Sequence, residues 1–168
     1  AHRTIKEQAG NLGTLLHELV EKFAKGEKYQ EPMNETLKTS FDQFQGWVKN
    51  NNVQFKSSER VVYSKEYNYA GTLDMTATVN GQNVLMDLKT SSGIWNEMHL
   101  QTAAYKQALQ EEFPEIKIDH TVIIRCGKDG VFETVEMNEF GENFTAFVGA
   151  LTLYRRLKKM DYNKKNTL

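Results

Sequence analysis

The chain has 168 residues, of which 39% are hydrophobic and 26% are charged, a balance typical of one globular domain with its own core. Its 21 basic and 22 acidic residues give a net charge of −1, which indicates no general attraction to nucleic acid. The single cysteine excludes a disulfide framework and a four-cysteine zinc or iron–sulfur site, and no apolar run is long enough to span a membrane, so we expect a reducing, cytoplasmic compartment without membrane contact.

The first half of the chain predicts two helices followed by three strands. Apolar residues recur at helical spacing in residues 11–27, where Gly26 supplies a stop, and again in residues 34–51. The periodicity then changes, and β-branched and aromatic residues predict three strands. These strands cover residues 59–67, 69–79 and 83–90.

The second half predicts a helix, two strands and a C-terminal helix. Their ranges are 95–113 for the helix that Pro114 ends, 118–126 and 131–137 for the strands, 138–160 for the last helix, and 161–168 for a polar tail. Because a helix connects the third and fourth strands, we expect these two to lie parallel in one sheet. The predicted fold is a single α/β domain over residues 1–168, with a mixed central sheet flanked by helices.

Two aspartates are placed unusually in the predicted hairpin. Asn80 and Gly81 form the preferred pair for a two-residue turn, and this turn fixes the register of the two strands. Counting back from it places Asp74 opposite Asp87, on the same face. Like charges directly opposite each other are destabilising, so something must compensate for them.

A divalent metal ion is one such compensation. Strict alternation puts Asp74, Thr76 and Thr78 on the same face as Asp87 and Lys89. The opposite face is apolar and suits the core: Leu73, Met75, Ala77, Val79, Val84, Met86 and Leu88. Two convergent carboxylates suit Mg²⁺, and a neighbouring lysine suits phosphoryl chemistry. The alternative is an exposed cluster of ion pairs that contributes little to stability.

The hairpin belongs to a longer pattern. Its parts in chain order are His17 on a helix, Gly71–Asp74, Asp87–Lys89, and Gln101 with Tyr105 on the next helix. This order resembles the PD-(D/E)XK nuclease superfamily, and most of all its RecB-like exonuclease branch, which includes phage-type and mitochondrial-type members. The resemblance covers residues 10–125 and leaves a strand and a basic helix, 131–165, beyond the core motifs.

The resemblance implies a role for each matching residue. The ligands of Mg²⁺ or Mn²⁺ would be His17, Asp74, Asp87 and the backbone carbonyl of Leu88. Lys89 would be the catalytic lysine beside Asp74 and Asp87, and Gln101 and Tyr105 would position the lysine, the water or a substrate phosphate. Some members of the branch hold an iron–sulfur cluster through cysteines that this chain lacks, so the resemblance is to the cluster-free members.

The implied function is a metal-dependent deoxyribonuclease, specifically an exonuclease that hydrolyses DNA ends in recombination or repair, in a bacterial or phage-infected cell. Two alternatives stay open. One is a nucleic-acid-binding module with the nuclease fold and no chemistry, and the other is a sequence-specific endonuclease. A second copy of the chain or a recombination protein could be a further partner.

Several single residues have two interpretations. Glu59 is either an additional acid near the site or a solvated strand end, and Glu21 either accepts a hydrogen bond from the ring of His17 or forms an ordinary exposed helix pair. His17 itself could be a boundary residue, and Gln101 could bond to loop backbone. Trp95 could stack on a base, but we expect a core anchor.

Other residues are expected to contact DNA. Thr90 and Ser91 follow the catalytic lysine directly, and Tyr105 faces the same site. Six of the 21 basic residues lie between Tyr154 and Lys165. Of these, the candidates for tracking a phosphate backbone are Arg155, Arg156, Lys158 and Lys159. The alternative for this stretch is a solvated helix face.

Overall fold

The computed structural model describes the backbone of residues 2–165 and the side chains of residues 12–162. Its elements in chain order are α1 (His2–Ala24), α2 (Glu35–Asn50), β1 (Gln54–Ser64), β2 (Tyr69–Val79), β3 (Gln82–Lys89), α3 (Asn96–Glu112), β4 (His120–Cys126), β5 (Phe132–Met137) and α4 (Phe140–Lys165). The order of helices and strands is the one that the sequence predicts. Among the described residues, none of the helices combines the length and apolar content needed to cross a membrane.

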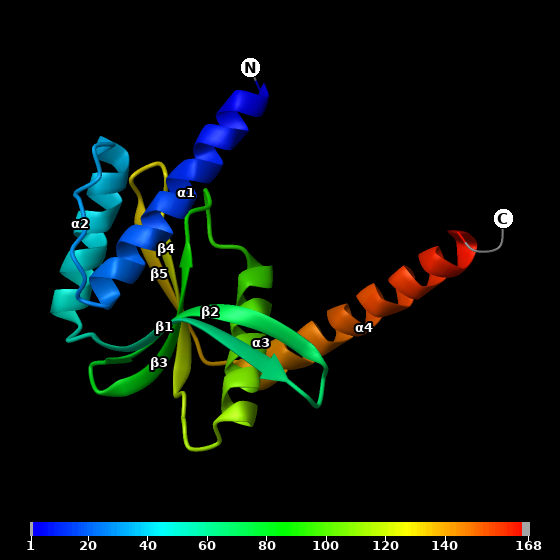
Figure 1. Ribbon diagram of the computed structural model, residues 1–168. Coiled ribbons are helices and arrows are strands. Elements are labelled where there is room, and N and C mark those ends of the chain that lie inside the picture. The colour runs from blue at the N-terminus through cyan, green and yellow to red at the C-terminus, as the bar shows by residue number, and fades with distance from the viewer. Residues whose placement is uncertain (1, 166–168) are drawn as a thin grey trace.

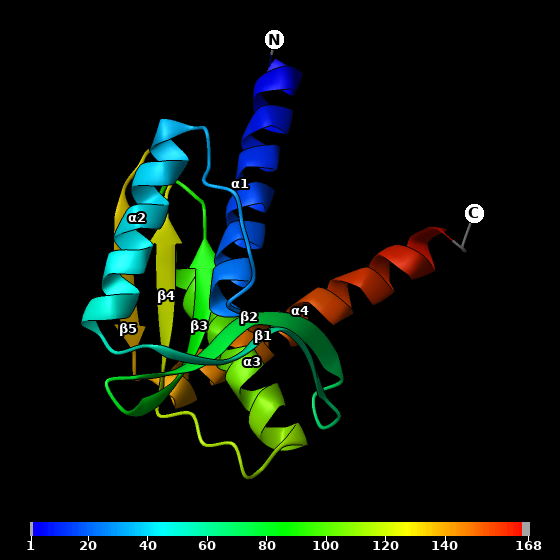
Figure 2. The same ribbon diagram turned by 60° about the vertical axis from the view of Figure 1, so that its left-hand side comes forward.

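The five strands form one mixed sheet in the order β1-β2-β3-β4-β5. The pairing of β3 with β4 is parallel, as expected for strands joined by a helix, and the other three pairings are antiparallel. Helices α1 and α2 cover one face of the sheet and α3 covers the other (Figures 1 and 2). The expected fold class is therefore confirmed.

The larger core cluster lies between the sheet and helices α1 and α2. Phe41 and Phe44 of α2 are fully buried there, and Phe41 lies at 5.8 Å from the ring of Phe23. Helix α2 begins where it does because the side chain of Asn34 accepts hydrogen bonds from the backbone of Thr36 and Leu37, at 3.1 and 3.0 Å. This cap fixes the end of α2 that lies nearest the turn between β4 and β5.

The hairpin turn forms as its sequence predicts. Asn80 and Gly81 have φ values of 48° and 86°, which a type I′ turn requires. The expected register follows from it, with Val79 paired to Gln82 and Ala77 to Val84.

The structure corrects two predicted boundaries. Strand β1 begins at Gln54, five residues earlier than expected, because Phe55 packs against the aromatic rings of Phe23 and Phe44. Helix α4 continues through Lys165, so residues 161–165 of the predicted polar tail are helical. That segment has no glycine or proline to stop the helix. The rest of the tail, residues 166–168, lies outside the described residues.

The predicted apolar face of the hairpin is wrong at one position. Met75 packs in the cluster beneath α1 and α2, whereas Leu73 packs in the second cluster, against α3. Residues two apart on a regular strand share a face, so the alternation breaks between them, at Asp74. Leu85 also packs against α3, so the face that holds Asp87 and Lys89 is partly apolar.

Replacing Phe41 by alanine should destabilise the protein by about 3–5 kcal/mol, because the ring is fully buried among other rings and would leave a cavity. Urea denaturation of the two proteins measures the difference. The control is Met33→Ala in the loop before α2, where the side chain is 97% exposed and the change should stay within about 0.5 kcal/mol. Equal losses for the two variants would contradict the described core.

Candidate metal centre

The candidate site lies where β2 and β3 separate. The ladder between these strands ends at the pair of Met75 and Met86, so Asp74 and Asp87 are not the direct cross-strand partners that the register predicts. The carboxylate of Asp74 instead accepts a hydrogen bond from the backbone N–H of Leu88, over 2.7 Å. This bond holds Asp74 at the edge of β3, beside Asp87.

Three side chains from three elements meet at this point. Ligand atoms of His17 on α1, Glu59 on β1 and Asp74 on β2 all lie within 4.8 Å of one another. Glu59 stands across from Asp74, because the residues on either side of it pair with Leu73 and Met75. An imidazole and two carboxylates at this spacing offer the nitrogen and oxygen donors that divalent cations bind.

The backbone at Glu59 is strained. Its φ is 47°, in the left-handed region that residues other than glycine seldom adopt. Such a conformation costs on the order of 1 kcal/mol and persists only where its surroundings hold it. From the sequence, Glu59 is either a further acid near the site or a solvated strand end. The structure places its exposed side chain with His17 and Asp74, in what we call the metal-type cluster.

Asp87 begins a chain of polar contacts that leads to α3. The ammonium of Lys89 lies 2.7 Å from Oδ2 of Asp87 and donates a hydrogen bond to Gln101 over 2.8 Å. The amide of Gln101 in turn donates to the hydroxyl of Tyr105 over 2.9 Å. The alternative interpretation, in which Gln101 bonds to loop backbone, is therefore wrong, because its amide bonds to Lys89 and Tyr105.

Burial changes the protonation of the acidic groups. Loss of water raises the pKa of Asp74 and that of Asp87 to about 6 each, against the opposing pull of Lys89 on both. Burial lowers the pKa of His17, so its ring is neutral near pH 7 and keeps a lone pair for a metal. Burial raises the pKa of Tyr105 to about 12, so its hydroxyl stays protonated.

Gly71 allows α3 to approach the hairpin. A Cβ at this position would lie 2.4 Å from Cε1 of Tyr105, closer than two such atoms can approach. The glycine that opens the Gly71–Asp74 motif therefore has a packing role: it lets the Tyr105 ring lie directly over β2.

Not every proposed site residue lies at this cluster. Glu21 forms an ion pair with Lys25 one turn along α1, which is the alternative interpretation of an exposed helix pair. The hydroxyl of Ser91 donates a hydrogen bond to the carbonyl of Gly93.

Trp95 is 50% exposed at the start of α3, so the prediction that it anchors the core is wrong. Its ring instead lies on Gly93, near the end of the loop that follows Lys89.

The basic residues of α4 lie apart from the cluster. The outer half of α4 extends away from the sheet in both views (Figures 1 and 2). Arg155 donates to the backbone carbonyl of Asn68, and Lys158 lies 5.0 Å from the ring of Tyr154. Arg156 and Lys159 are exposed and form no ion pair with any side chain that the structure describes.

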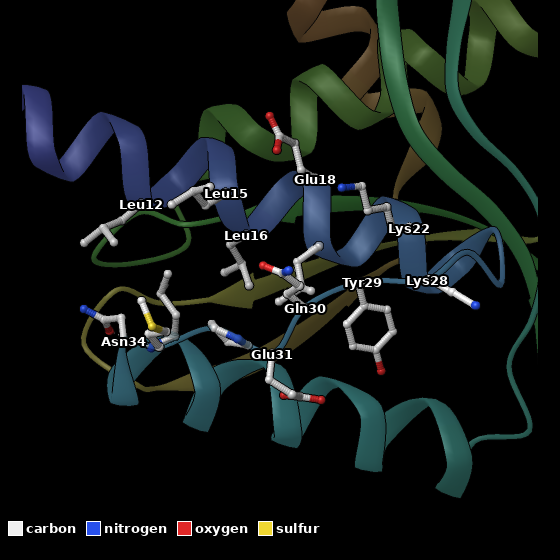
Figure 3. Close-up of a pocket in the computed structure, with 14 residues that line it drawn as sticks. Leu12, Leu15, Leu16, Glu18, Lys22, Lys28, Tyr29, Gln30, Glu31 and Asn34 are labelled. Atoms are coloured by element: carbon white, nitrogen blue, oxygen red, sulfur yellow. Dashed lines mark hydrogen bonds between the residues drawn. The ribbon is translucent and has the colours of Figure 1, made fainter.

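An apolar groove lies apart from the cluster of His17, Glu59 and Asp74. It has a volume of about 700 Å³ and lies between α1 and the segment that leads into α2 (Figure 3). Its apolar walls include Leu12, Leu15 and Leu19 of α1 and Pro32 and Met33 of the loop. None of the proposed site residues lines it.

Sequence reasoning missed one buried charge beside the site. Arg125 of β4 pairs in register with Lys89 and is only 2% exposed. Its guanidinium donates to the carbonyl of Ser91 over 2.7 Å and forms an ion pair with Asp129. The signal was present, since Arg125 is the only charged residue in the otherwise apolar run from Val122 to Cys126.

Comparisons with known proteins find a likeness in fold. No protein-family model and no curated protein matches the sequence. A matching crystal structure is that of a protein from Eubacterium rectale named "Putative exonuclease", with a TM-score of 0.53 and 9% sequence identity. The match covers 84% of this chain and 64% of that one, so this chain spans less than two thirds of its length. At this identity the likeness supports a shared fold, consistent with a restriction-endonuclease-like α/β core.

The stability of the metal-free protein should depend on Asp74 in a pH-dependent way. An aspartate whose pKa rises from 3.8 to about 6 on folding holds its proton more tightly when folded, so stability falls as pH rises from about 4 to about 6. Asp74→Asn can accept the Leu88 hydrogen bond without the charge. At pH 7 the variant should be more stable than the parent by roughly 2–3 kcal/mol, and at pH 4 nearly equal to it.

Urea denaturation in EDTA at the two pH values measures this difference. The matched control is Asp42→Asn, since Asp42 is exposed and forms only a surface pair with Lys38. If Asp74→Asn is less stable than the parent at pH 7, loss of water does not raise the pKa of Asp74 in the folded protein.

Proposed function

We propose that this protein is a divalent-metal-dependent deoxyribonuclease of the PD-(D/E)XK superfamily, in its RecB-like branch, and that it acts as an exonuclease on DNA ends. The observation that carries the proposal is the convergence of His17, Glu59 and Asp74 beside the ion pair of Asp87 with Lys89. The order of the motifs along the chain and the fold shared with the Eubacterium rectale protein support it.

The ligands would be His17, Asp74, Asp87, the carbonyl of Leu88 and the additional acid Glu59. Bound Mg²⁺ or Mn²⁺ supplies Lewis-acid polarisation of a phosphate oxygen and lowers the pKa of water. The donor set fits these ions, because carboxylates dominate it, and because Asp87 is buried and Asp74 half-buried with only the ammonium of Lys89 to offset their charge. The neutral ring of His17 completes the set.

Lys89 would stabilise the negative charge that develops on the phosphate. Its ammonium is held by Asp87 on one side and Gln101 on the other, so its position is fixed before substrate arrives. Gln101 accepts from Lys89 through its oxygen and donates through its nitrogen to the oxygen of Tyr105. The hydroxyl proton of Tyr105 therefore points elsewhere and is free for a phosphate oxygen.

DNA is the proposed partner, and the remaining basic residues would bind its backbone. Arg156 and Lys159 lie exposed on α4, together with Arg155 and Lys158, and Thr90 and Ser91 lie next to Lys89. From the resemblance to the RecB-like branch we also propose the setting: the cytoplasm of a bacterial or phage-infected cell, with recombination or repair as the pathway.

The same exposed cations support a second candidate function, a binding module that performs no chemistry. Calorimetric titration with Mn²⁺ separates the two. The nuclease should bind Mn²⁺ in a manner that Asp74→Asn weakens strongly, whereas a binding module has no reason to bind the ion at this site.

Replacing Asp87 or Lys89 by alanine should lower DNA hydrolysis by about 10²–10³-fold, since each change removes a charge placed at the reacting phosphate. Release of nucleotides from end-labelled single- and double-stranded DNA with Mg²⁺ measures the rate. Lys38→Ala is the control, because Lys38 pairs with Asp42 on the surface of α2. The enzyme proposal fails if the parent releases nothing from either substrate, or if both variants match it.

A further inference from the structure

Three segments meet one turn along α1 from the metal centre. Gly13 is buried there, and a Cβ at its position would lie 2.8 Å from the hydroxyl oxygen of Thr90 and 3.4 Å from Nζ of Lys128. Thr90 directly follows Lys89, and Lys128 belongs to the turn between β4 and β5. A side chain at position 13 would crowd the Thr90 hydroxyl and touch the Lys128 ammonium, so the glycine leaves this space open.

This meeting point lies on the same side of α1 as the proposed metal ligand. Gly13 and His17 are four residues apart, so they share a helix face and are separated by about 6 Å along the axis. Lys89 and Arg125 are register partners in the parallel strands β3 and β4, whose carboxyl ends share one edge of the sheet. Thr90 and Lys128 both emerge from that edge.

Arg125 fixes the two loops relative to each other. Its buried guanidinium donates to the carbonyl of Ser91, next to Thr90, and pairs with Asp129, next to Lys128. Glu133 lies 3.5 Å from the same guanidinium, so the charge of Arg125 is neutralised within the protein. Arg125 thus acts as a positioning residue and does not itself offer charge to a ligand.

The turn that carries Lys128 is held from beneath as well. The hydroxyl of Ser40 on α2 donates to the carbonyl of Gly127 over 2.7 Å, and the N–H of Gly127 donates to the carbonyl of Val131 over 2.8 Å. The backbone on either side of Lys128 is therefore fixed before any ligand arrives.

At the meeting point of Gly13, Thr90 and Lys128, the ammonium of Lys128 has no carboxylate partner among the described residues. Lys128 is half-buried and forms no ion pair or hydrogen bond with any side chain in the described range 12–162. Together with the hydroxyl of Thr90, it offers donors suited to an anion with several oxygens.

We propose that Lys128 and Thr90 bind the phosphate that flanks the scissile phosphate on the DNA strand. The inference rests on the proposed nuclease function, and it adds a second phosphate contact at a set distance from the metal centre. Arg125 positions the two loops, and Gly13 leaves the space that the phosphate donors occupy. The protein would then prefer substrates with more than one phosphate.

The test compares a ten-nucleotide single strand with a dinucleoside monophosphate, which has one phosphate only. Lys128→Gln should reduce kcat/KM on the longer substrate relative to the shorter one by about ten-fold, as expected for one lost charge-assisted contact. The loss should lie mainly in KM, and Lys128→Arg should restore most of it. Lys49→Gln at the far end of α2 is the matched control.

Binding of the labelled ten-nucleotide strand in EDTA gives a second measurement that does not need cleavage. Each phosphate contact contributes about 0.7 to the slope of log K against log salt for single strands, so Lys128→Gln should lower the slope by about that amount. Gly13→Ala should also reduce affinity, since the added methyl group would lie 2.8 Å from the Thr90 hydroxyl oxygen and must push it aside.

An unchanged salt slope, or an equal loss of kcat/KM on the two substrates, would overturn the flanking-phosphate site while leaving the nuclease proposal intact. A parent protein that neither binds nor cleaves either substrate would overturn both proposals.

Discussion

Asp87 is buried and Asp74 is half-buried where β2 and β3 separate, and this loss of water raises the pKa of each carboxylate to about 6. Near neutral pH both groups are mostly ionised, so positive charge must come from their surroundings. Lys89 supplies part of it, at 2.7 Å from Asp87. The positive charge of Lys89 does not balance both carboxylates. This shortage of positive charge, and the nearby donor atoms of His17 and Glu59, are the physical reasons for proposing a divalent cation here.

Each layer of the fold contributes one part of this site. The hairpin brings the two aspartates to one level of the sheet, α1 carries His17 across one face, and α3 carries Gln101 and Tyr105 across the other (Figure 2). Close approach of these layers depends on glycines, as at Gly71, where a side chain would collide with the Tyr105 ring. The apolar clusters on both faces hold the layers in place, so the polar groups need little rearrangement to act together.

Sequence reasoning succeeded where local rules decide the outcome. The Asn80–Gly81 turn fixes the hairpin register, and the helix between β3 and β4 makes these strands parallel. It failed where tertiary contacts override alternation: β2 changes face at Asp74, so Leu73 packs against α3. The role of Arg125 was also out of reach, because a charge inside an apolar strand does not reveal the loops that will surround it.

The identity of the groups around the proposed cation is the central claim, and a crystal structure of the protein grown with Mn²⁺ tests it most directly through anomalous scattering. The account predicts one strong peak bonded to the imidazole of His17 and to carboxylate oxygens of Glu59, Asp74 and Asp87, at roughly 2.0–2.3 Å. A peak bound only by surface acids elsewhere, with Asp74 still turned to the Leu88 amide and His17 uncoordinated, would contradict it.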